Sequence, residues 1–329
     1  MFVLILLVCA VALLILRKTT AYWVKPVTKF LFPVGYWLYT TRLGYAFHLR
    51  SLNKEKSKVI PHSVAQPTPL SGVLVVPIPI LSDNYSYFII DLTSKDAVVV
   101  DPADPGAIKT YVVEKRINLK AILTTHKHWD HAGGNVLLKR QYPDLQVYGG
   151  ANENVAAQTH PVKDNDTIKL GKFTIDVLST PGHTTGHVVY VLQSEPPCVF
   201  TGDLIFVAGN GQMFEGTPQT MLASINRIQQ LPSNSLLFPG HEYAFNDVKF
   251  ASSLLPSYTP VQMKWQWVKQ QRSIKLSTVP SILLEELKYN PFMLTDSDIL
   301  KDALGLPHHT PPAEVLARLR QRKDNFRTN

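Results

Sequence analysis

The sequence predicts an α+β fold in which two rounds of short strands alternate with helices, followed by a helical C-terminal region. Three observations support this class. Short apolar runs recur between residues 73 and 201 and are separated by turn residues. Polar segments rich in histidine directly follow several of these runs. From Asn246 onward, the apolar residues have the spacing of amphipathic helices.

The first 50 residues are predicted to be a hydrophobic anchor with an interfacial segment. Residues 2–16 are continuously apolar, and a helix of this length would span about 22 Å, less than the roughly 30 Å of a bilayer's hydrocarbon core. Arg17 and Lys18 follow the run, which favours an uncleaved single anchor with the rest of the chain facing the cytosol. We therefore expect a membrane protein. A cleaved mitochondrial or secretory leader is the alternative.

The remainder of the chain is predicted to contain a linker at 51–70, a catalytic domain at 71–245 and a helical substrate-binding region at 246–329. The linker is polar and contains three prolines. Strands are expected at 73–78, 85–91, 97–101, 119–123, 146–148, 173–178, 188–192 and 199–201. Helices are expected at 105–116, 135–141, 217–230, 247–255, 261–271, 281–286, 295–304 and 312–325.

Charge and cysteine content argue against a nucleic-acid substrate and against a fold held by disulfide bonds. The net charge is +8, but residues 1–62 hold nine basic residues and one acidic residue, so the remaining 24 basic and 24 acidic residues cancel. A neutral catalytic region argues against nucleic acid as substrate. The only cysteines, Cys9 and Cys198, provide no disulfide framework.

The segment after the strand predicted at 119–123 contains three histidines and an aspartate within six residues. His126 and His128 are two residues apart, so in an extended loop both side chains can converge on one ion. Asp130 and His131 turn toward a second position beside it. Neutral imidazole and carboxylate groups are ligands that suit zinc, iron or manganese. The segment therefore predicts a metal site.

Three further segments repeat this arrangement of a ligand after a strand and next to a glycine. His183, Asp203 and His241 each follow an apolar run and lie beside a residue that lets the backbone turn tightly. A single histidine in such a loop is usually a hydrogen-bonding residue, but the recurrence favours a shared metal centre. His187 lies beyond its turn and is expected to be structural or to support a ligand.

Together these motifs resemble the glyoxalase II (hydroxyacylglutathione hydrolase) branch of the metallo-β-lactamase superfamily, over roughly residues 73–326. This resemblance implies a four-layer αββα sandwich with a C-terminal helical region. The segments that carry it are Ser82–Tyr85, His126–His131, Pro181–Thr184, Gly202–Asp203, Phe206–Gly209, Phe214–Gly216, Gly240–Tyr243, Tyr289–Phe292 and Arg322–Asp324.

The resemblance also implies two divalent metal ions, with zinc as the first choice and iron or manganese as alternatives. Asp130, His183 and Asp203 are the predicted catalytic residues. Two ions that share a water lower its pKa, so that hydroxide can attack a thioester carbonyl. The implied ligands are His126, His128 and His183 for one ion, Asp130, His131 and His241 for the other, and Asp203 for both.

An acyl-glutathione or another small thioester is the expected substrate. The resemblance makes Tyr243, Arg320 and Lys323 candidate substrate-binding residues. The family has a lysine and a tyrosine where this chain has Gln212 and Phe214. Losing two such contacts, at about 1.5–3 kcal/mol each for hydrogen bonds to charged groups, predicts weakened glutathione recognition.

Two other functions remain open from the sequence. A glutathione persulfide dioxygenase on the same fold would use one iron, and the complete second set of ligands speaks against it. A mainly non-catalytic interaction protein, acting at membranes through its leader, would explain the altered Gln212 and Phe214.

Overall fold

The computed structural model describes residues 34–55 and 61–326. The chain divides into two compact units, residues 1–49 and 50–329, and each is considered by itself. In the first unit, residues 34–39 are helical and helix α3 (Arg42–Glu55) begins. The predicted anchor at 2–16 lies outside the described residues. Within the ranges that are described, we find no helix of the length and apolarity that a membrane span requires.

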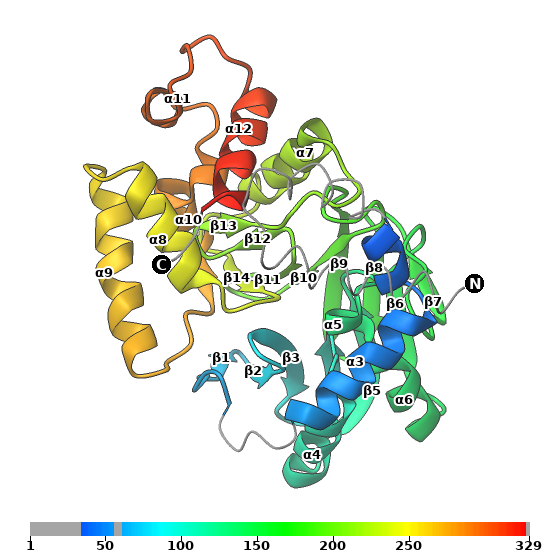
Figure 1. Ribbon diagram of the computed structural model, residues 1–329. Coiled ribbons are helices and arrows are strands. Elements are labelled where there is room, and N and C mark those ends of the chain that lie inside the picture. Colours follow the sequence, from blue (N-terminus) through cyan, green and yellow to red (C-terminus); the bar gives the residue numbers. More distant parts are fainter. Residues whose placement is uncertain (1–33, 56–60, 327–329) are drawn as a thin grey trace. The chain divides into compact units, whose positions relative to one another are not determined.

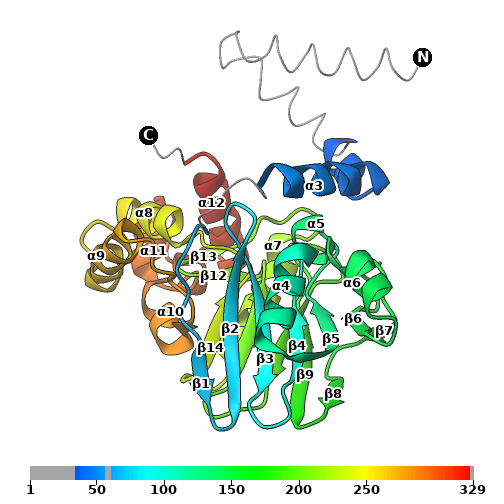
Figure 2. The same cartoon turned by 90° about the horizontal axis from the view of Figure 1, so that it is seen from below.

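The first of two large sheets contains seven strands in chain order (Figures 1 and 2). Strands β1 to β4 pair antiparallel, whereas β4 to β7 pair parallel. Parallel neighbours need a crossover, which helix α4 (Pro105–Lys115) supplies between β4 and β5 and helix α6 (Asn135–Gln141) supplies between β5 and β6. The strands are β1 (Thr68–Leu70), β2 (Val73–Ile80), β3 (Asn84–Asp91), β4 (Asp96–Val100), β5 (Asn118–Thr124), β6 (Gln146–Gly150) and β7 (His160–Val162).

The second sheet has six strands in the order β15-β14-β11-β10-β9-β8. Its one parallel pair, β11 with β14, is joined through helix α7 (Pro218–Gln229). Thr217 caps this helix in a reciprocal capping box with Thr220. The strands are β8 (Thr167–Leu170), β9 (Phe173–Ser179), β10 (Val188–Leu192), β11 (Cys198–Gly202), β14 (Leu236–Pro239) and β15 (Ser281–Ile282), with a separate hairpin of β12 (Ile205–Phe206) and β13 (Gly209–Asn210).

The C-terminal part of the chain is predominantly helical. It follows β14 and contributes β15 to the edge of the second sheet. Its elements are α8 (Ala244–Leu254), α9 (Thr259–Ser273), α10 (Leu283–Tyr289), the short 3₁₀ helix η1 (Pro291–Met293), α11 (Asp298–Leu304) and α12 (Pro312–Asp324).

Three apolar clusters show that the second unit is a four-layer sandwich. Between the sheets, Ile89 packs in one cluster with Val177 and Phe200. On the outer face of the first sheet, the strands pack against α4 and α6, whereas the outer face of the second packs against α7 and the C-terminal helices. Figure 1 shows α4 and α7 on opposite sides of the two sheets. The α+β class and the order of two sheets between helices, both predicted from the sequence, are confirmed in this part of the chain.

Part of the segment predicted as a linker is structured. Val64 pairs with Leu276 in a parallel bridge, and β1 pairs with β2. The guanidinium group of Arg272 donates hydrogen bonds to the Ser63 hydroxyl group and the His62 carbonyl group. These contacts hold residues 62–70 against the sandwich, although their polar composition is typical of an unstructured segment.

Candidate metal centre

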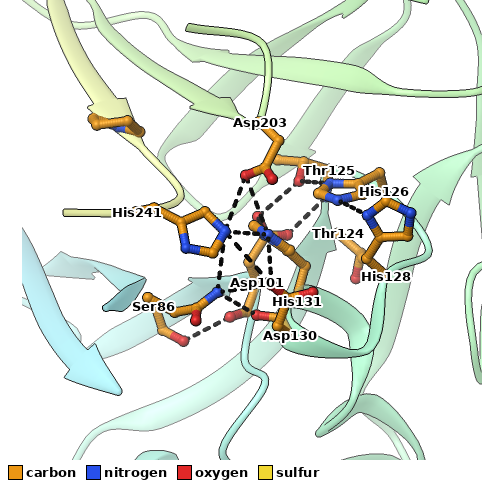
Figure 3. Close-up of polar contacts among 12 residues, drawn as sticks. Ser86, Asp101, Thr124, Thr125, His126, His128, Asp130, His131, Asp203 and His241 are labelled. Atoms are coloured by element: carbon orange, nitrogen blue, oxygen red, sulfur yellow. Dashed lines mark hydrogen bonds and ion pairs between the residues drawn. The ribbon is translucent and has the colours of Figure 1, made fainter. Parts of the chain in front are cut away.

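Seven candidate ligands converge at one end of the two sheets. His126 and His128 follow β5, and Asp130 and His131 lie in the short helix α5 (Trp129–Ala132). The other three ligands, His183, Asp203 and His241, follow β9, β11 and β14. Figure 3 shows His131 and His241 directed toward Asp203, with His126 and His128 beside them. The structure therefore brings together, from four loops, all the side chains that the sequence motifs had singled out.

The first group consists of His126, His128 and His183. The Nδ1 atom of His128 lies 3.0 Å from Nε2 of His126 and 3.0 Å from Nε2 of His183. All three side chains are buried, and their nitrogens lie close enough to share one ion. One Nδ1 proton could satisfy only one of the two neighbouring lone pairs, so the arrangement suits a cation better than a set of hydrogen bonds.

The second group consists of Asp130, His131 and His241, and Asp203 lies between the two groups. The Oδ1 atom of Asp203 is 3.2 Å from Nε2 of His131 and 3.4 Å from Nε2 of His241, while its Oδ2 atom is 3.4 Å from Nε2 of His183. The Oδ2 atom of Asp130 lies 3.5 Å from Nε2 of His241. The carboxylate of Asp203 thus faces both groups.

Outer partners fix the ring nitrogens that point away from the centre. Nδ1 of His131 lies 2.9 Å from Oδ2 of Asp101, and Nδ1 of His241 lies 2.9 Å from Oδ1 of Asp83. Nδ1 of His183 lies 2.8 Å from the carbonyl oxygen of Gln212. Because these nitrogens face acceptors, they carry the ring protons, and each Nε2 atom presents a lone pair to the centre.

His126 is oriented in the same way through Thr125. The Thr125 hydroxyl donates to Oδ2 of Asp101 at 2.7 Å and therefore accepts from Nδ1 of His126 at 3.0 Å. Asp101 thus orients two ligand rings, one directly and one through Thr125. Asp101 follows β4 directly, as Asp203 follows β11, but it has no neighbouring histidine and was therefore not predicted to have a role.

The donor set fits divalent metal ions. Asp203 is 7% exposed, and no side chain within the described ranges donates a hydrogen bond of good geometry to its Oδ1 atom. A buried carboxylate oxygen without a donor is costly unless a cation neutralises it. Lone pairs of imidazole and carboxylate groups meeting at one point match the ligand preferences of zinc, iron and manganese.

The electrostatics differ between the two groups. Burial, with a smaller contribution from the neighbouring His183, lowers the pKa of His128 to about 3. Burial also opposes protonation of His241, but Asp203 and Asp83 together raise its pKa to about 9. The second group therefore lies in a more negative environment, which favours a cation.

Two supporting residues were missed or left open in the sequence. The amide nitrogen of Asn84 donates to the main-chain carbonyl of Asp130 at 3.0 Å and lies 3.3 Å from its Oδ2 atom. His187 is fully buried, and its Nε2 atom accepts from the main-chain nitrogen of Asp203 at 3.3 Å. His187 thus supports the candidate ligand Asp203, which is one of the two roles expected for it from the sequence. The contact of Asn84 with Asp130 was not predicted, and only the position of Asn84 after a turn could have suggested it.

The predicted substrate-binding residues Gln212 and Phe214 lie beside the first group. The Phe214 ring centroid is 5.0 Å from that of His183 and 5.6 Å from that of His128. Gln212 is exposed, and its side-chain nitrogen lies 3.4 Å from Oδ1 of Asp324. The Phe214 ring therefore lies directly beside the first group, whereas Gln212 contacts that group through its main-chain carbonyl oxygen, 2.8 Å from Nδ1 of His183.

Tyr243 lies on the other side, stacked on His241 with ring centroids 4.5 Å apart. Arg320 and Lys323, on α12, are engaged in ion pairs within the chain. Nη2 of Arg320 lies 2.7 Å from Oδ1 of Asp324, and Nζ of Lys323 lies 2.5 Å from Oδ1 of Asp247. Neither cation is therefore without a counter-charge, which the sequence did not reveal.

Comparisons with known proteins now define the class. Residues 81–241 match the family described as metallo-beta-lactamase superfamily, so this αββα unit with its histidine-rich centre is that of a metallo-β-lactamase superfamily enzyme. Residues 242–326 match the family described as hydroxyacylglutathione hydrolase C-terminus. The chain is also 42% identical over 255 residues to a cytoplasmic hydroxyacylglutathione hydrolase of Arabidopsis thaliana, covering 76% of this chain and 98% of that protein. The chain belongs to the hydroxyacylglutathione hydrolase family of metal-dependent thioester hydrolases.

Two solved structures support the fold alone. A metallo-beta-lactamase from Staphylococcus aureus superposes with a TM-score of 0.51 and 23% identity, covering 72% of this chain and 67% of that chain. The structure of ETHE1 from Myxococcus xanthus superposes with a TM-score of 0.51 and 24% identity, covering 71% of this chain and 94% of that chain.

The predicted membrane localisation, with its membrane partner, is contradicted. The Arabidopsis relative carries the name of a cytoplasmic enzyme, and the described residues contain no membrane-spanning helix. The prediction depended on an apolar run that, as a helix of about 1.5 Å per residue, is shorter than a bilayer's hydrocarbon core.

Proposed function

We propose that this chain is a dinuclear metallohydrolase that cleaves an acyl-glutathione or a closely related small thioester. The observation that carries the proposal is the position of Asp203 between two sets of buried ligand atoms. One set would hold the first ion and the other the second, with Asp203 in contact with both. The proposed ligands are His126, His128 and His183, then Asp130, His131 and His241.

The residues of the chain prepare this centre for hydrolysis. Asp101, Asp83 and the Gln212 carbonyl hold the ligand rings in one tautomer, so that their lone pairs need no rearrangement. When bound, a pair of divalent ions lowers the pKa of a shared water and polarises a carbonyl group. Phe214 packs its ring against His183 and Tyr243 stacks on His241, so an aromatic ring flanks each ligand group. A thiolate leaving group, with a solution pKa near 8.5, needs no strong general acid.

Recognition of the glutathione moiety is proposed to be weak. The family's lysine and tyrosine are replaced by Gln212 and Phe214, which removes a cation and a hydroxyl donor. Arg320 and Lys323 keep their charge, but each is already paired with an aspartate. A substrate carboxylate would have to compete with these aspartates, which reduces the gain from each charged contact.

The proposed division of labour assigns the hydrolytic centre to residues 71–245 and substrate binding to residues 246–329. The two matched families meet between residues 241 and 242, close to this boundary. The residue that joins the two parts is Tyr243, because it stacks on the candidate ligand His241 and is the N-cap residue directly before α8.

A thioester panel combined with metal analysis tests the function. The purified chain, loaded with zinc, iron or manganese, should contain about two ions and hydrolyse acyl-glutathiones faster than acyl-coenzyme A thioesters. Loss of hydrolysis on every thioester would refute the proposal. Oxygen uptake with glutathione persulfide, with a single bound iron, would instead establish the dioxygenase reaction.

A further inference from the structure

Lys127 lies between two candidate ligands, His126 and His128, and its main chain is held by a buried carboxylate. The Lys127 main-chain nitrogen donates to Oε1 of Glu153 at 3.0 Å. The Oε2 atom of the same carboxylate accepts from the main-chain nitrogen of Gly186 at 2.8 Å. Glu153 is 0% exposed, so its two oxygens connect the loop of His126 and His128 to the loop that follows His183.

A second carboxylate makes a parallel connection between the same loops. Nζ of Lys127 lies 2.6 Å from Oε1 of Glu215. The Oε2 atom of Glu215 accepts from the main-chain nitrogen of Thr185 at 2.7 Å and from its hydroxyl group at 3.0 Å. The side chains of Lys127 and Glu215 are 21% and 16% exposed, so water screens this ion pair only partly.

The local sequence is shaped to admit these connections. A Cβ atom on Gly186 would lie 2.5 Å from Oε2 of Glu153 and 2.7 Å from the main chain of Asn152, so only glycine allows the close approach. Residue 214, which precedes Glu215, places its ring against His128 and His183. The loop that carries Glu215 therefore covers the same pair of ligands that the two carboxylates hold together.

We propose that Glu153, together with the Lys127–Glu215 ion pair, positions the two loops of the first ion group. Both carboxylates tie the His126 and His128 loop to the His183 loop, so that three nitrogens from these two segments stay at binding distance. Asp83 and Asn84 contact the second group, whereas Asp101 contacts His131 directly and His126 through Thr125. Glu153 and Glu215 are thus positioning residues selective for one ion, and this inference rests on the ligand set given under Proposed function.

Glu153→Gln is the sharpest test, because the two main-chain nitrogens contact different oxygens of Glu153. In glutamine one of these oxygens is replaced by an NH2 group, which is a donor and cannot accept from a main-chain nitrogen. Zn²⁺ is titrated by calorimetry into the metal-free full chain. One of two binding steps should weaken by about ten- to a hundredfold, as is typical when a ligand's supporting partner is lost, while the other step is unchanged. The matched control is Glu114→Gln, an exposed glutamate of α4, which should leave both steps as in the wild type. Equal weakening of both steps, or no weakening, would overturn the positioning role.

A second measurement does not need metal. Exchange of the Lys127 and Gly186 amide hydrogens in the metal-free chain should be at least about tenfold faster in Glu153→Gln than in the control. Wild-type exchange at both amides would refute the inference, whatever Zn²⁺ does. A wild-type chain that binds no Zn²⁺ but shows the expected exchange would refute the proposed ligand set and leave the connection between the loops standing.

The ion pair is tested by a double-mutant cycle. Lys127→Met and Glu215→Gln should each weaken the same Zn²⁺ step as Glu153→Gln, and the double variant should weaken it less than the sum of the two. Strict additivity would mean that Lys127 and Glu215 act separately. This cycle also serves if Glu153→Gln fails to fold.

Discussion

The metal centre and the basic end of α12 were both singled out in the sequence, yet their side chains are in opposite situations. At the centre, ligand atoms face one another, while the outward ring nitrogens of His131, His183 and His241 contact acceptors such as Asp101. At α12, the charged atoms of Arg320 and Lys323 already contact Asp324 and Asp247. A charge that a motif suggests for binding is available only if the fold has not neutralised it.

The difference has a physical origin. When the ring protons lie on the outward nitrogens, the neutral imidazoles and the carboxylates present acceptors to one another, which suits a cation. Opposite charges do satisfy one another, and a buried aspartate such as Asp247 would be costly without its lysine. The predictions below test this contrast, beginning with the largest expected effect.

Replacing Asp203 with alanine should cause the largest loss. The variant lacks the carboxylate that lies between the two groups, so we expect both ions to be lost and thioester hydrolysis to fall by at least about a thousandfold, or roughly 4 kcal/mol. Metal stoichiometry and kcat/KM measure the effect. A variant that retains two ions would contradict the bridging position.

His241→Ala should have a smaller and selective effect. His241 belongs to the second group only, so one ion should remain bound while activity decreases. The comparison of interest is the metal content of this variant beside that of Asp203→Ala. Equal stoichiometry in the two would mean that the ligands do not divide as proposed.

Lys323→Met should destabilise the fold. Asp247 is 5% exposed, and loss of Lys323 leaves its carboxylate buried without a counter-charge, at a cost of about 3 kcal/mol. Burial already raises the pKa of Asp247, so the penalty is largest at neutral pH, shrinks as the pH falls from this raised pKa toward the unfolded value of about 4, and is absent below that value.

The measurement is urea unfolding at several pH values, with Lys323→Met plus Asp247→Asn as the matched control. This double variant should recover most of the lost stability because no carboxylate remains to be buried. Equal stability of wild type and Lys323→Met at neutral pH would show that the fold does not depend on the ion pair between Lys323 and Asp247. Lys323 would then be free to bind substrate.

The pair Gln212→Lys with Phe214→Tyr should have the smallest effect. It restores the cation and the hydroxyl donor that the family has, and neither residue is a proposed ligand. The KM for an acyl-glutathione should fall by about tenfold, equivalent to roughly 1.4 kcal/mol, with little change in kcat. An unchanged KM at full metal content would mean that the site was built for another thiol carrier.

Much of the fold and the ligand set could be predicted because the signals are local. The predicted helix at 135–141 coincides with α6, and the strands predicted at 85–91 and 188–192 differ from β3 and β10 by at most one residue. The ligand segments were recognisable because each lies at the end of an apolar strand. Strands β7 and β8 were missed since their burial alternates in short edge segments with little apolar content.

The supporting residues could not be predicted because their partners are distant in sequence. Asp83 contacts His241, 158 residues away, and Glu153 contacts Lys127 and Gly186 on either side of it in the chain. No spacing rule connects such pairs. Only folding brings them together, and for the same reason the ion pair of Lys323 with Asp247 was invisible in the motif. The pair of Arg320 with Asp324 is different, because the two residues are four apart on α12 and helical spacing alone could have indicated it.

The apolar cluster on the outer face of the second sheet has a consequence for synthesis of the protein. Val189 of β10 and Ile225 of α7 belong to the same cluster as Val315 and Leu319 of α12, the last helix of the described residues. While the chain grows on the ribosome, the cover of this face is incomplete until α12 has emerged. A nascent chain that stalls before residue 312 would therefore present an apolar, aggregation-prone surface, and chaperones would meet it there first.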